Sequence, residues 1–340
     1  MRHPTRLGIA ALSLTFVAAG CAQPDDGAKG GQKNAADRRA DVTSCGRKLT
    51  FDGAPERAVA LDQSSTEVLL ELGLQDRMAG TSNLKTKIAP EYRDAYAKVP
   101  VLSPKILTNE QLRAATPDIA VAGMSDYFTK DRVGTRSELA DLDLPSYVSA
   151  VDCPKQQKPG KAKTSFELLF QDYENLGKIF GVEDRAARLV EEQRATLDKA
   201  AKAADRVKGE PNVVWLYSVY GDAPYVAGKS AMPSEMSRLV GAKNAFDDVD
   251  EDWPAVTWEQ IAERNPDFIV VGDLSERGKP GDSAADKRAA MRDNPLMSKL
   301  AAVAENRIVE IPGTEMDPSV RTVSALPRLT DGMKELGHVR

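Results

Sequence analysis

An internal repeat constrains the fold of this 340-residue chain more than any other feature. Residues 110–123 align without gaps to residues 259–272, and the offset is 149 at every position (259 − 110). Both copies begin with Glu-Gln, carry Pro-Asp in the middle and end with Gly, and most other matched positions are apolar. Each copy predicts a helix that ends before Pro-Asp and leads into a buried strand. Two copies are too few for a solenoid, so the repeat predicts two domains of one plan, unless each domain arrived independently at this common α/β unit.

The remaining pattern also alternates short apolar runs with helical segments. The run Ala58–Leu61 follows Pro55, and Ser64 and Glu67 stand next at capping-box spacing before a helical apolar face. This alternation predicts an α/β fold with mostly parallel sheets. A helix over 164–181 and a second from about 183 to 205 lie between the repeats. We therefore predict an amino-terminal lobe over 43–163, an interdomain helix over 164–181 and a carboxyl-terminal lobe over 182–340.

The first 20 residues have the pattern of an export signal. Arg2 and Arg6 precede the apolar stretch 7–19, which is too short to span a bilayer. The ending Ala-Ala-Gly-Cys resembles a bacterial lipobox and predicts that Cys21 is lipidated, with an ordinary signal peptide as the alternative. Residues 21–42 lack apolar periodicity and predict a disordered tether. The expected location is the outer face of the cytoplasmic membrane.

That location bears on the other two cysteines of the chain. Cys45 and Cys153 are an even number of thiols in an oxidising compartment, and they flank the predicted amino-terminal lobe. We predict a disulfide between them, with two buried free thiols as the alternative.

Charge and histidine content exclude several functions. Only two histidines are present, His3 and His338, so no Ser-His-Asp triad, HExxH helix or His-rich metal site can form. A net charge of −5 argues against nucleic-acid binding. No resident cofactor and no protein-held metal are expected.

At nearly full length the chain resembles a known family, the class III substrate-binding proteins that serve siderophore and cobalamin ABC importers. The resemblance rests on residues 55–62 leading into 65–73, on the two repeats, and on Trp253-Pro254 followed by Thr257-Trp258-Glu259. It implies two Rossmann-like lobes with parallel sheets, joined by one long helix. It also implies a monomeric binding protein, not an enzyme, that serves an ABC permease dimer.

Ligands of open α/β sheets bind at the carboxyl ends of the strands, which face the cleft in a two-lobed protein. That rule selects aromatic residues and two cations near the predicted strand ends: Tyr127, Tyr217, Tyr220, Tyr225, Trp253, Lys105 and Arg321. The resemblance places ligand contacts close to Lys105, Tyr127, Trp253 and the Met316–Arg321 loop. Each aromatic could instead be ordinary packing, and both cations could be solvated charges.

The predicted ligand is a ferric siderophore, in which the chelator holds the iron. Cobalamin or haem are alternatives on the same fold, and an exported hydrolase using acids between Asp247 and Asp252 is a third. The resemblance implies that Glu110 and Glu259, one in each repeat, dock to the permease. The alternative is that each glutamate only favours its helix dipole.

Overall fold

Two five-stranded sheets organise the computed structural model, which describes residues 39–153 and 163–340. The amino-terminal sheet has the order β5-β4-β3-β6-β7 and is parallel throughout. Its strands are β3 (Ala58–Ala60), β4 (Met78–Ser82), β5 (Val101–Ser103), β6 (Ile119–Ala122) and β7 (Ser146–Val148). The prediction of parallel-sheet α/β lobes is confirmed.

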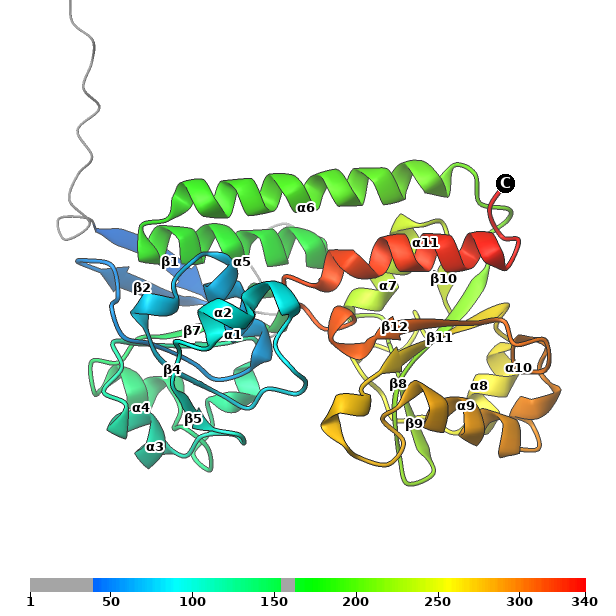
Figure 1. The fold of residues 1–340 in the computed structure, drawn as a ribbon, viewed down its shortest axis with the longest axis horizontal. Helices are drawn as coiled ribbons and strands as arrows, with labels where there is room; N and C mark the ends of the chain where they lie inside the picture. The colour runs from blue at the N-terminus through cyan, green and yellow to red at the C-terminus, as the bar shows by residue number, and fades with distance from the viewer. Residues whose placement is uncertain (1–38, 154–162) are drawn as a thin grey trace, which may run out of the picture. The chain divides into compact units, whose positions relative to one another are not determined.

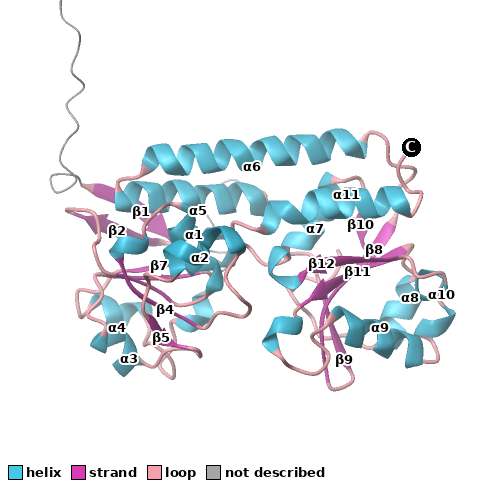
Figure 2. Ribbon diagram, in the orientation of Figure 1, coloured by secondary structure: helices cyan, strands magenta, loops and turns pink. Residues whose placement is uncertain are grey.

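The carboxyl-terminal sheet has the order β10-β8-β11-β12, and β9 pairs antiparallel with β8. Its strands are β8 (Asn212–Tyr220), β9 (Ala223–Val226), β10 (Lys243–Asn244), β11 (Phe268–Asp273) and β12 (Ile308–Pro312). Helices lie outside the strands of each lobe (Figure 2). The first lobe carries α1 (Gln63–Glu71), α2 (Arg93–Tyr96), α3 (Asn109–Ala114) and α4 (Arg136–Ala140). The second carries α7 (Met232–Leu239), α8 (Trp258–Arg264), α9 (Ala284–Asp293), α10 (Ala301–Ala304) and α11 (Ala325–Glu335).

The two repeats fold alike, down to their helix caps. Thr108 and Thr257 cap α3 and α8, and each forms a capping box with the glutamine three residues later. At matching positions after the helices, Thr116 and Asn265 have φ of 45° and 44°. The two repeats therefore form the same local structure, once in each lobe.

The aspartate of each Pro-Asp pair ties two strands together. The Asp118 carboxylate accepts hydrogen bonds from the backbone N–H groups of Glu56 and Arg57, just before β3. The Asp267 carboxylate accepts one from the N–H of Asn212, where β8 begins. In each lobe the repeat strand thus fixes the start of its parallel neighbour, which explains why aspartate recurs there.

A pair of helices connects the lobes (Figure 1). The helix predicted over 164–181 is α5 (Ser165–Phe180), which ends at Gly181 with a left-handed φ of 69°. The chain then turns into α6 (Glu183–Ala204) and packs it against α5. Near its start Arg185 donates to the carbonyl of Leu72 in the first lobe, and further along Gln193 donates to Val320 in the second. The single connecting helix that we predicted is therefore only half of the connection, because the glycine reverses the chain.

A β-hairpin precedes the first sheet, so the amino-terminal lobe begins earlier than the predicted residue 43. Strands β1 (Ala40–Ser44) and β2 (Arg47–Phe51) pair antiparallel, and Ala40 and Val42 are buried. The tether predicted to reach residue 42 therefore overlaps β1. The hairpin escaped prediction because its second strand is mostly exposed and carries two basic residues. Cys21 and the predicted signal peptide lie outside the described residues.

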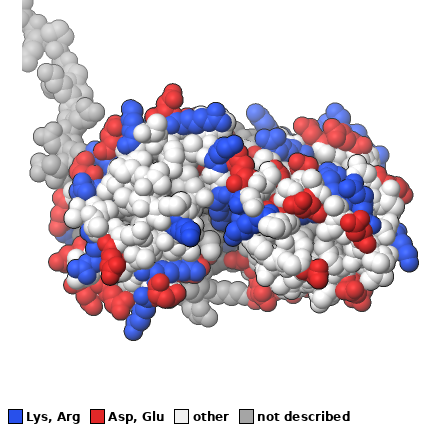
Figure 3. All heavy atoms as spheres, turned by 60° about the horizontal axis from the view of Figure 1, so that its bottom comes forward, with Lys and Arg blue, Asp and Glu red and all other residues white. Residues whose placement is uncertain are grey.

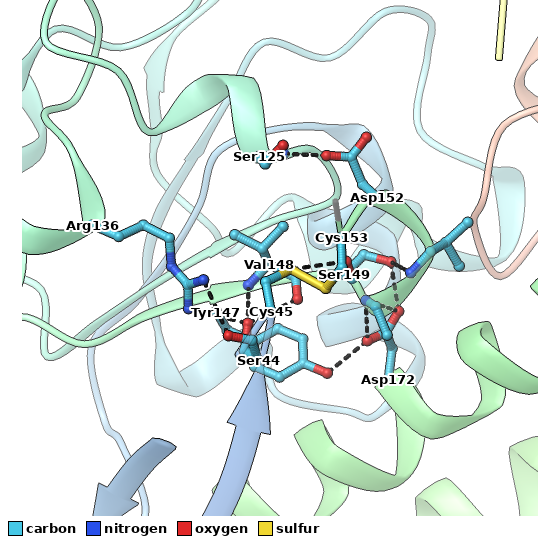
Figure 4. Close-up of a disulfide and its surroundings, with 12 residues drawn as sticks. Ser44, Cys45, Ser125, Arg136, Tyr147, Val148, Ser149, Asp152, Cys153 and Asp172 are labelled. Carbon is cyan, nitrogen blue, oxygen red and sulfur yellow. Dashed lines mark hydrogen bonds between the residues drawn. A yellow bond between two sulfur atoms is a disulfide. The ribbon is translucent and has the colours of Figure 1, made fainter. Parts of the chain in front are cut away.

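The predicted disulfide is present between Cys45, at the turn of this hairpin, and Cys153, after β7 (Figure 4). Beside it Ser44 accepts from the N–H of Val148 and donates to the carbonyl of the same residue. Asp172 of α5 accepts from Tyr147, Ser149 and the N–H of Ala150. Burial raises the pKa of Asp172 to about 6 despite these hydrogen bonds. The hairpin, β7 and α5 thus hold the segment that leads to Asp152.

We expect the Cys45→Ser/Cys153→Ser variant to lose stability, since the bridge closes a loop with a sequence separation of 108. Loop-closure entropy predicts a loss of about 2–5 kcal/mol in the free energy of unfolding, measured by urea denaturation. Reduced wild-type protein should behave like the variant. Two alkylatable thiols in unreduced, exported protein would contradict the prediction.

Candidate functional site

A cavity of about 100 Å³ lies between the lobes, at the carboxyl ends of their strands. The first lobe contributes residues that follow β3, β4, β6 and β7, among them Asp62, Lys85, Tyr127 and Asp152. The second lobe contributes residues 230–232, 252–253, Thr314 and 316–319. The cavity thus lies in the region to which the strand-end rule points.

Three of the predicted ligand contacts line this cavity: Tyr127, Trp253 and Met316. The Tyr127 hydroxyl accepts a hydrogen bond of 2.8 Å from Asn83, which fixes the ring. Met316 is fully buried and packs so close to Gly272 that a Cβ atom there would lie 3.0 Å from its sulfur. Trp253 is half-buried and offers an aromatic face from the second lobe.

Tyr217 lies behind Trp253, outside the lining. Its ring centroid is 4.4 Å from that of Trp253, and its hydroxyl donates to Asp317 at 3.2 Å. Burial raises the pKa of Tyr217, and the Asp317 carboxylate raises it further. Tyr217 therefore supports the tryptophan. Tyr220 and Tyr225 pack edge to face with each other on β8 and β9 and do not line the cavity.

Lys105 is exposed in the loop after β5 and does not line the cavity. The lysine of the site is Lys85, from the loop after β4, whose ammonium lies 3.0 Å from the Asp317 carboxylate and 3.3 Å from the Tyr217 hydroxyl. Burial alone would lower the pKa of Lys85, but Asp317, Tyr217 and Tyr127 together hold it above its ordinary value. The sequence signal was present, since Lys85 is three residues beyond the end of β4. Our selection of cations near strand ends did not include Lys85.

We predicted that Arg321 contacts the ligand, but in the structure its side chain contacts the opposite lobe. Its guanidinium makes a bidentate ion pair with Glu67 of α1, with Nε at 2.6 Å from one carboxylate oxygen. The Glu67 side chain is 1% exposed and the Arg321 side chain 17%. Asp62 and Ser65 form the capping box of α1 in place of the predicted Ser64 and Glu67. Glu67 is thus free of the capping role and pairs across the cleft.

A third ion pair joins the lobes beside these two. The Glu276 carboxylate accepts from the backbone N–H of Lys87 at 2.7 Å and lies 3.4 Å from its ammonium. We call the pairs Glu67–Arg321, Lys85–Asp317 and Lys87–Glu276 the interlobe ion pairs. Figure 3 shows Lys and Arg side chains gathered between the lobes on the face drawn, with acidic side chains beside them.

One glutamine organises the first-lobe side of the interlobe ion pairs. The Gln63 carbonyl oxygen accepts from the backbone N–H groups of Lys85 and Thr86, each at 3.0 Å. Its amide nitrogen donates to Glu67 at 3.1 Å. Gln63 therefore holds the loop after β4 against α1, so that Glu67, Lys85 and Lys87 all face the second lobe.

Glu110 and Glu259 are exposed, each two residues after the threonine that caps α3 or α8. The structure thus gives them equivalent positions in the two lobes, away from the cavity. Neither lines it.

Two aspartates of the lining, the buried Asp62 and the half-buried Asp152, have a raised pKa. Asp62 accepts from the N–H groups of Ser65 and Gly123, and burial raises its pKa although these hydrogen bonds lower it. Asp152 accepts from the N–H of Ser125. Burial raises the pKa of Asp152 too, and the carboxylates of Asp252 and Asp126 add to the effect. Sequence reasoning missed Asp152, because the chain between β7 and α5 carries no periodic signal.

The sequence matches the model of a known protein family. A family model described as "Periplasmic binding protein" matches residues 59–314, which span both lobes and the helix pair. The chain belongs to this family. Its members are substrate-binding proteins of ABC importers that act outside the cytoplasm, on siderophores, cobalamin or haem. It is therefore a binding protein and not an enzyme, which sets aside the hydrolase alternative.

Individual relatives match this chain over most of its length, and the solved structures among them share its fold. The chain is 28% identical over 343 residues to an "Uncharacterized ABC transporter substrate-binding lipoprotein YvrC" of Bacillus subtilis, covering 97% of this chain and 96% of the relative. A solved periplasmic binding protein from Veillonella parvula is 29% identical, with a TM-score of 0.75 over 87% of this chain and 97% of the other. A solved structure from Saccharomonospora viridis, described as an ABC-type Fe3+-hydroxamate transport system, is 25% identical, with a TM-score of 0.71 over 86% and 98%.

We expect Arg321→Gln to destabilise the protein, because it leaves the Glu67 carboxylate buried without its counter-charge. Breaking a buried ion pair from one side costs on the order of 3 kcal/mol. Glu67→Gln combined with Arg321→Gln should recover much of that loss, and urea denaturation of the four proteins gives the coupling. Additive effects of the two substitutions would show that the pair is not coupled.

Proposed function

We propose that this protein captures a ferric siderophore of the hydroxamate type in the cleft and delivers it to an ABC permease dimer. The observation that carries the proposal is the lining of the cavity, in which Tyr127, Trp253 and Met316 offer apolar surface beside polar groups at strand ends. Such walls suit a bulky, partly apolar chelate. The likeness to the Saccharomonospora viridis structure supports the hydroxamate class. In this proposal the siderophore alone coordinates the iron.

Binding of such a ligand requires the lobes to separate. The cavity holds about 100 Å³, whereas pockets for ligands of drug size measure roughly 300–1,000 Å³. The interlobe ion pairs hold the lobes together beside the cavity, and Glu67, Lys85 and Asp317 of these pairs are part of its lining. We infer that a chelate enters as some of these pairs open.

We also propose that Cys21 anchors the protein to the outer face of the cytoplasmic membrane. The Ala-Ala-Gly-Cys sequence and the lipoprotein name of the Bacillus subtilis relative support this. No helix in residues 39–153 and 163–340 is long and apolar enough to cross a bilayer. Labelling of cells with a fatty-acid analogue tests the anchor directly.

Cobalamin is the second candidate ligand. A cobalamin-binding protein of Halobacterium salinarum is 24% identical over 293 residues, covering 83% of this chain and 70% of the relative. Calorimetric titration of the purified protein with ferric hydroxamates, ferric catecholates, cobalamin and haem separates the candidates. The proposal requires a ferric hydroxamate to bind most tightly, and it fails if cobalamin or haem does.

We expect Trp253→Ala to weaken binding of the ferric hydroxamate at least tenfold, about 1.4 kcal/mol. The substitution removes an aromatic wall of the cavity and leaves Tyr217 without its stacking partner. Calorimetry measures the change, and Trp258→Phe is the control because Trp258 is buried away from the cavity. Equal losses in both variants would mean that the cleft is not the binding site.

Docking to the permease predicts a different phenotype for Glu110 and Glu259. The double variant Glu110→Ala/Glu259→Ala should abolish uptake in cells, since two separated carboxylates fix the orientation of two lobes over one pore. Ligand affinity and melting temperature should stay nearly unchanged, because both side chains are exposed. The matched control is Glu91→Ala/Glu305→Ala, which removes two other exposed glutamates. Normal uptake by the first variant would refute the docking role.

A further inference from the structure

Two arginines of the amino-terminal lobe have only neutral hydrogen-bond partners. Arg136 is half-buried at the start of α4, and Arg47 begins β2 of the hairpin. Among residues 39–153 and 163–340, both guanidiniums donate to hydroxyl and carbonyl oxygens, and no ion pair joins either of them to a carboxylate. A half-buried charge ordinarily has a counter-charge. The described part of the chain does not supply one here.

The hydrogen bonds of Arg136 fix the position of its guanidinium. Nε donates to the Ser146 hydroxyl at 3.1 Å, and Nη2 donates to the carbonyl of the same residue at 2.7 Å. Nη1 donates to the carbonyl of Ser44 at 3.1 Å. Figure 4 shows the Arg136 guanidinium turned towards Ser44, beside the disulfide. These acceptors orient the guanidinium but leave its charge uncompensated.

The register of the hairpin brings Arg47 to the same place. Arg47 is the partner of Ser44 across the turn, and Ser44 is the residue that Arg136 contacts. The Arg47 guanidinium in turn donates at 2.6 Å to the hydroxyl of Ser137, which directly follows Arg136. Two separate hydrogen-bonded contacts therefore join β2 and the start of α4 through these arginines. Burial and, to a smaller extent, the charge of Arg47 lower the pKa of Arg136 to about 10.

The described acids near these arginines in the sequence have other partners. Successive side chains of a strand point to opposite faces, so Lys48 lies on the face opposite to Arg47. On that face Asp41 pairs with Lys48 at 3.5 Å and with Arg39 at 3.6 Å. Glu138 of α4 accepts at 2.8 Å from both the N–H and the hydroxyl of Thr135, as part of a capping box. The counter-charge of the two arginines must therefore come from elsewhere.

The donors at this place match a phosphate group. A guanidinium presents its N–H groups in a planar fork that fits two phosphate oxygens at once. Arg47 is exposed and uses one nitrogen for Ser137, so the rest of its fork is available to solvent. The oxygens of one phosphate group suffice to accept from this fork and from the exposed Ser137 hydroxyl while the charge of Arg136 is neutralised.

We propose that Arg47, Arg136 and Ser137 form a binding site for a phosphate group. The site is separate from the cleft, since none of the three residues lines the cavity. Inorganic phosphate and the headgroup of an anionic phospholipid offer the same chemistry. The lipid source agrees with the proposed anchor at Cys21, because β1 begins 19 residues later (40 − 21). A chain of that length spans at most about 70 Å, which keeps the hairpin near the membrane.

Thermal melting of the purified full-length protein tests the site. We expect about 20 mM inorganic phosphate to raise the melting temperature by about 2 °C relative to chloride at the same ionic strength, because a ligand of the folded state stabilises it. Arg47→Gln should abolish this increase. Lys48→Gln is the matched control and should retain it, since it removes the neighbouring charge, which is paired with Asp41 on the other face. Arg136 is left unchanged, because its hydrogen bonds also hold Ser44 and Ser146.

Hydrogen exchange of the hairpin amides distinguishes the two sources of phosphate. The same proteins are mixed with vesicles of phosphatidylcholine alone or of phosphatidylcholine with phosphatidylglycerol. Slower exchange in residues 40–51 with the anionic vesicles, seen in wild type and Lys48→Gln but absent in Arg47→Gln, identifies a lipid headgroup as the ligand. This result supports the site even if free phosphate has no effect on melting.

The remaining outcomes also decide the proposal. An Arg47-dependent increase in melting temperature without any difference between the vesicles supports the site and assigns it to the free anion. Effects that persist in Arg47→Gln, or that disappear equally in Lys48→Gln, would show general attraction to surface charge and would overturn the site. The absence of an effect in both experiments would overturn it as well. Neither experiment measures chelate binding, so failure of the phosphate site leaves the proposed siderophore function standing.

Discussion

The ion pair between Glu67 and Arg321 sets the geometry on which the cleft depends. A carboxylate that is 1% exposed needs a counter-charge, and here the counter-charge comes from the other lobe. The first helix of the amino-terminal lobe, α1, is therefore fixed to the loop after β12, the last strand of the carboxyl-terminal lobe. Gln63 extends this fixed region to the loop after β4, so that two further ion pairs form beside it. Gln63, Glu67, Lys85 and Asp317 of this region also line the cavity.

In each lobe, a frame of paired strands supports that lobe's side of the contact. In both, a repeat strand lies next to the first strand of the sheet, and an aspartate at its start holds the neighbouring backbone. Parallel pairing then brings the carboxyl ends of these strands to one edge of the sheet. The ligand-facing loops are consequently the variable part of a repeated plan, and their side chains, not the sheets, decide what binds.

Much of this frame was predictable from the sequence, because it depends on local patterns. The repeat predicted two like lobes, and the strand-end rule together with the family resemblance selected Tyr127, Trp253 and Met316, which line the cavity. The failures among the charged residues of the cleft involve contacts between distant segments. Glu67 has the spacing of a helix cap, but only the folded chain shows that Asp62 caps the helix and that Glu67 faces Arg321. Lys85 and Lys105 both follow strands, and nothing local distinguishes the lysine in the cleft from the one in solvent. Both helices of the pair were predicted, but the part of the second in joining the lobes was not, since Gly181 marks a break and not the direction of the chain beyond it.

The bridge between Cys45 and Cys153 has a mechanical consequence. A protein held at its amino end transmits any pull through β1 to Cys45, five residues after the strand begins. From there the shortest covalent path crosses the sulfur atoms to Cys153 and leads towards α5, so the sheet of the first lobe lies outside the line of tension. That lobe would keep its fold under loads that unravel an unbridged domain, and the cleft wall it carries would stay assembled while the chain is stretched.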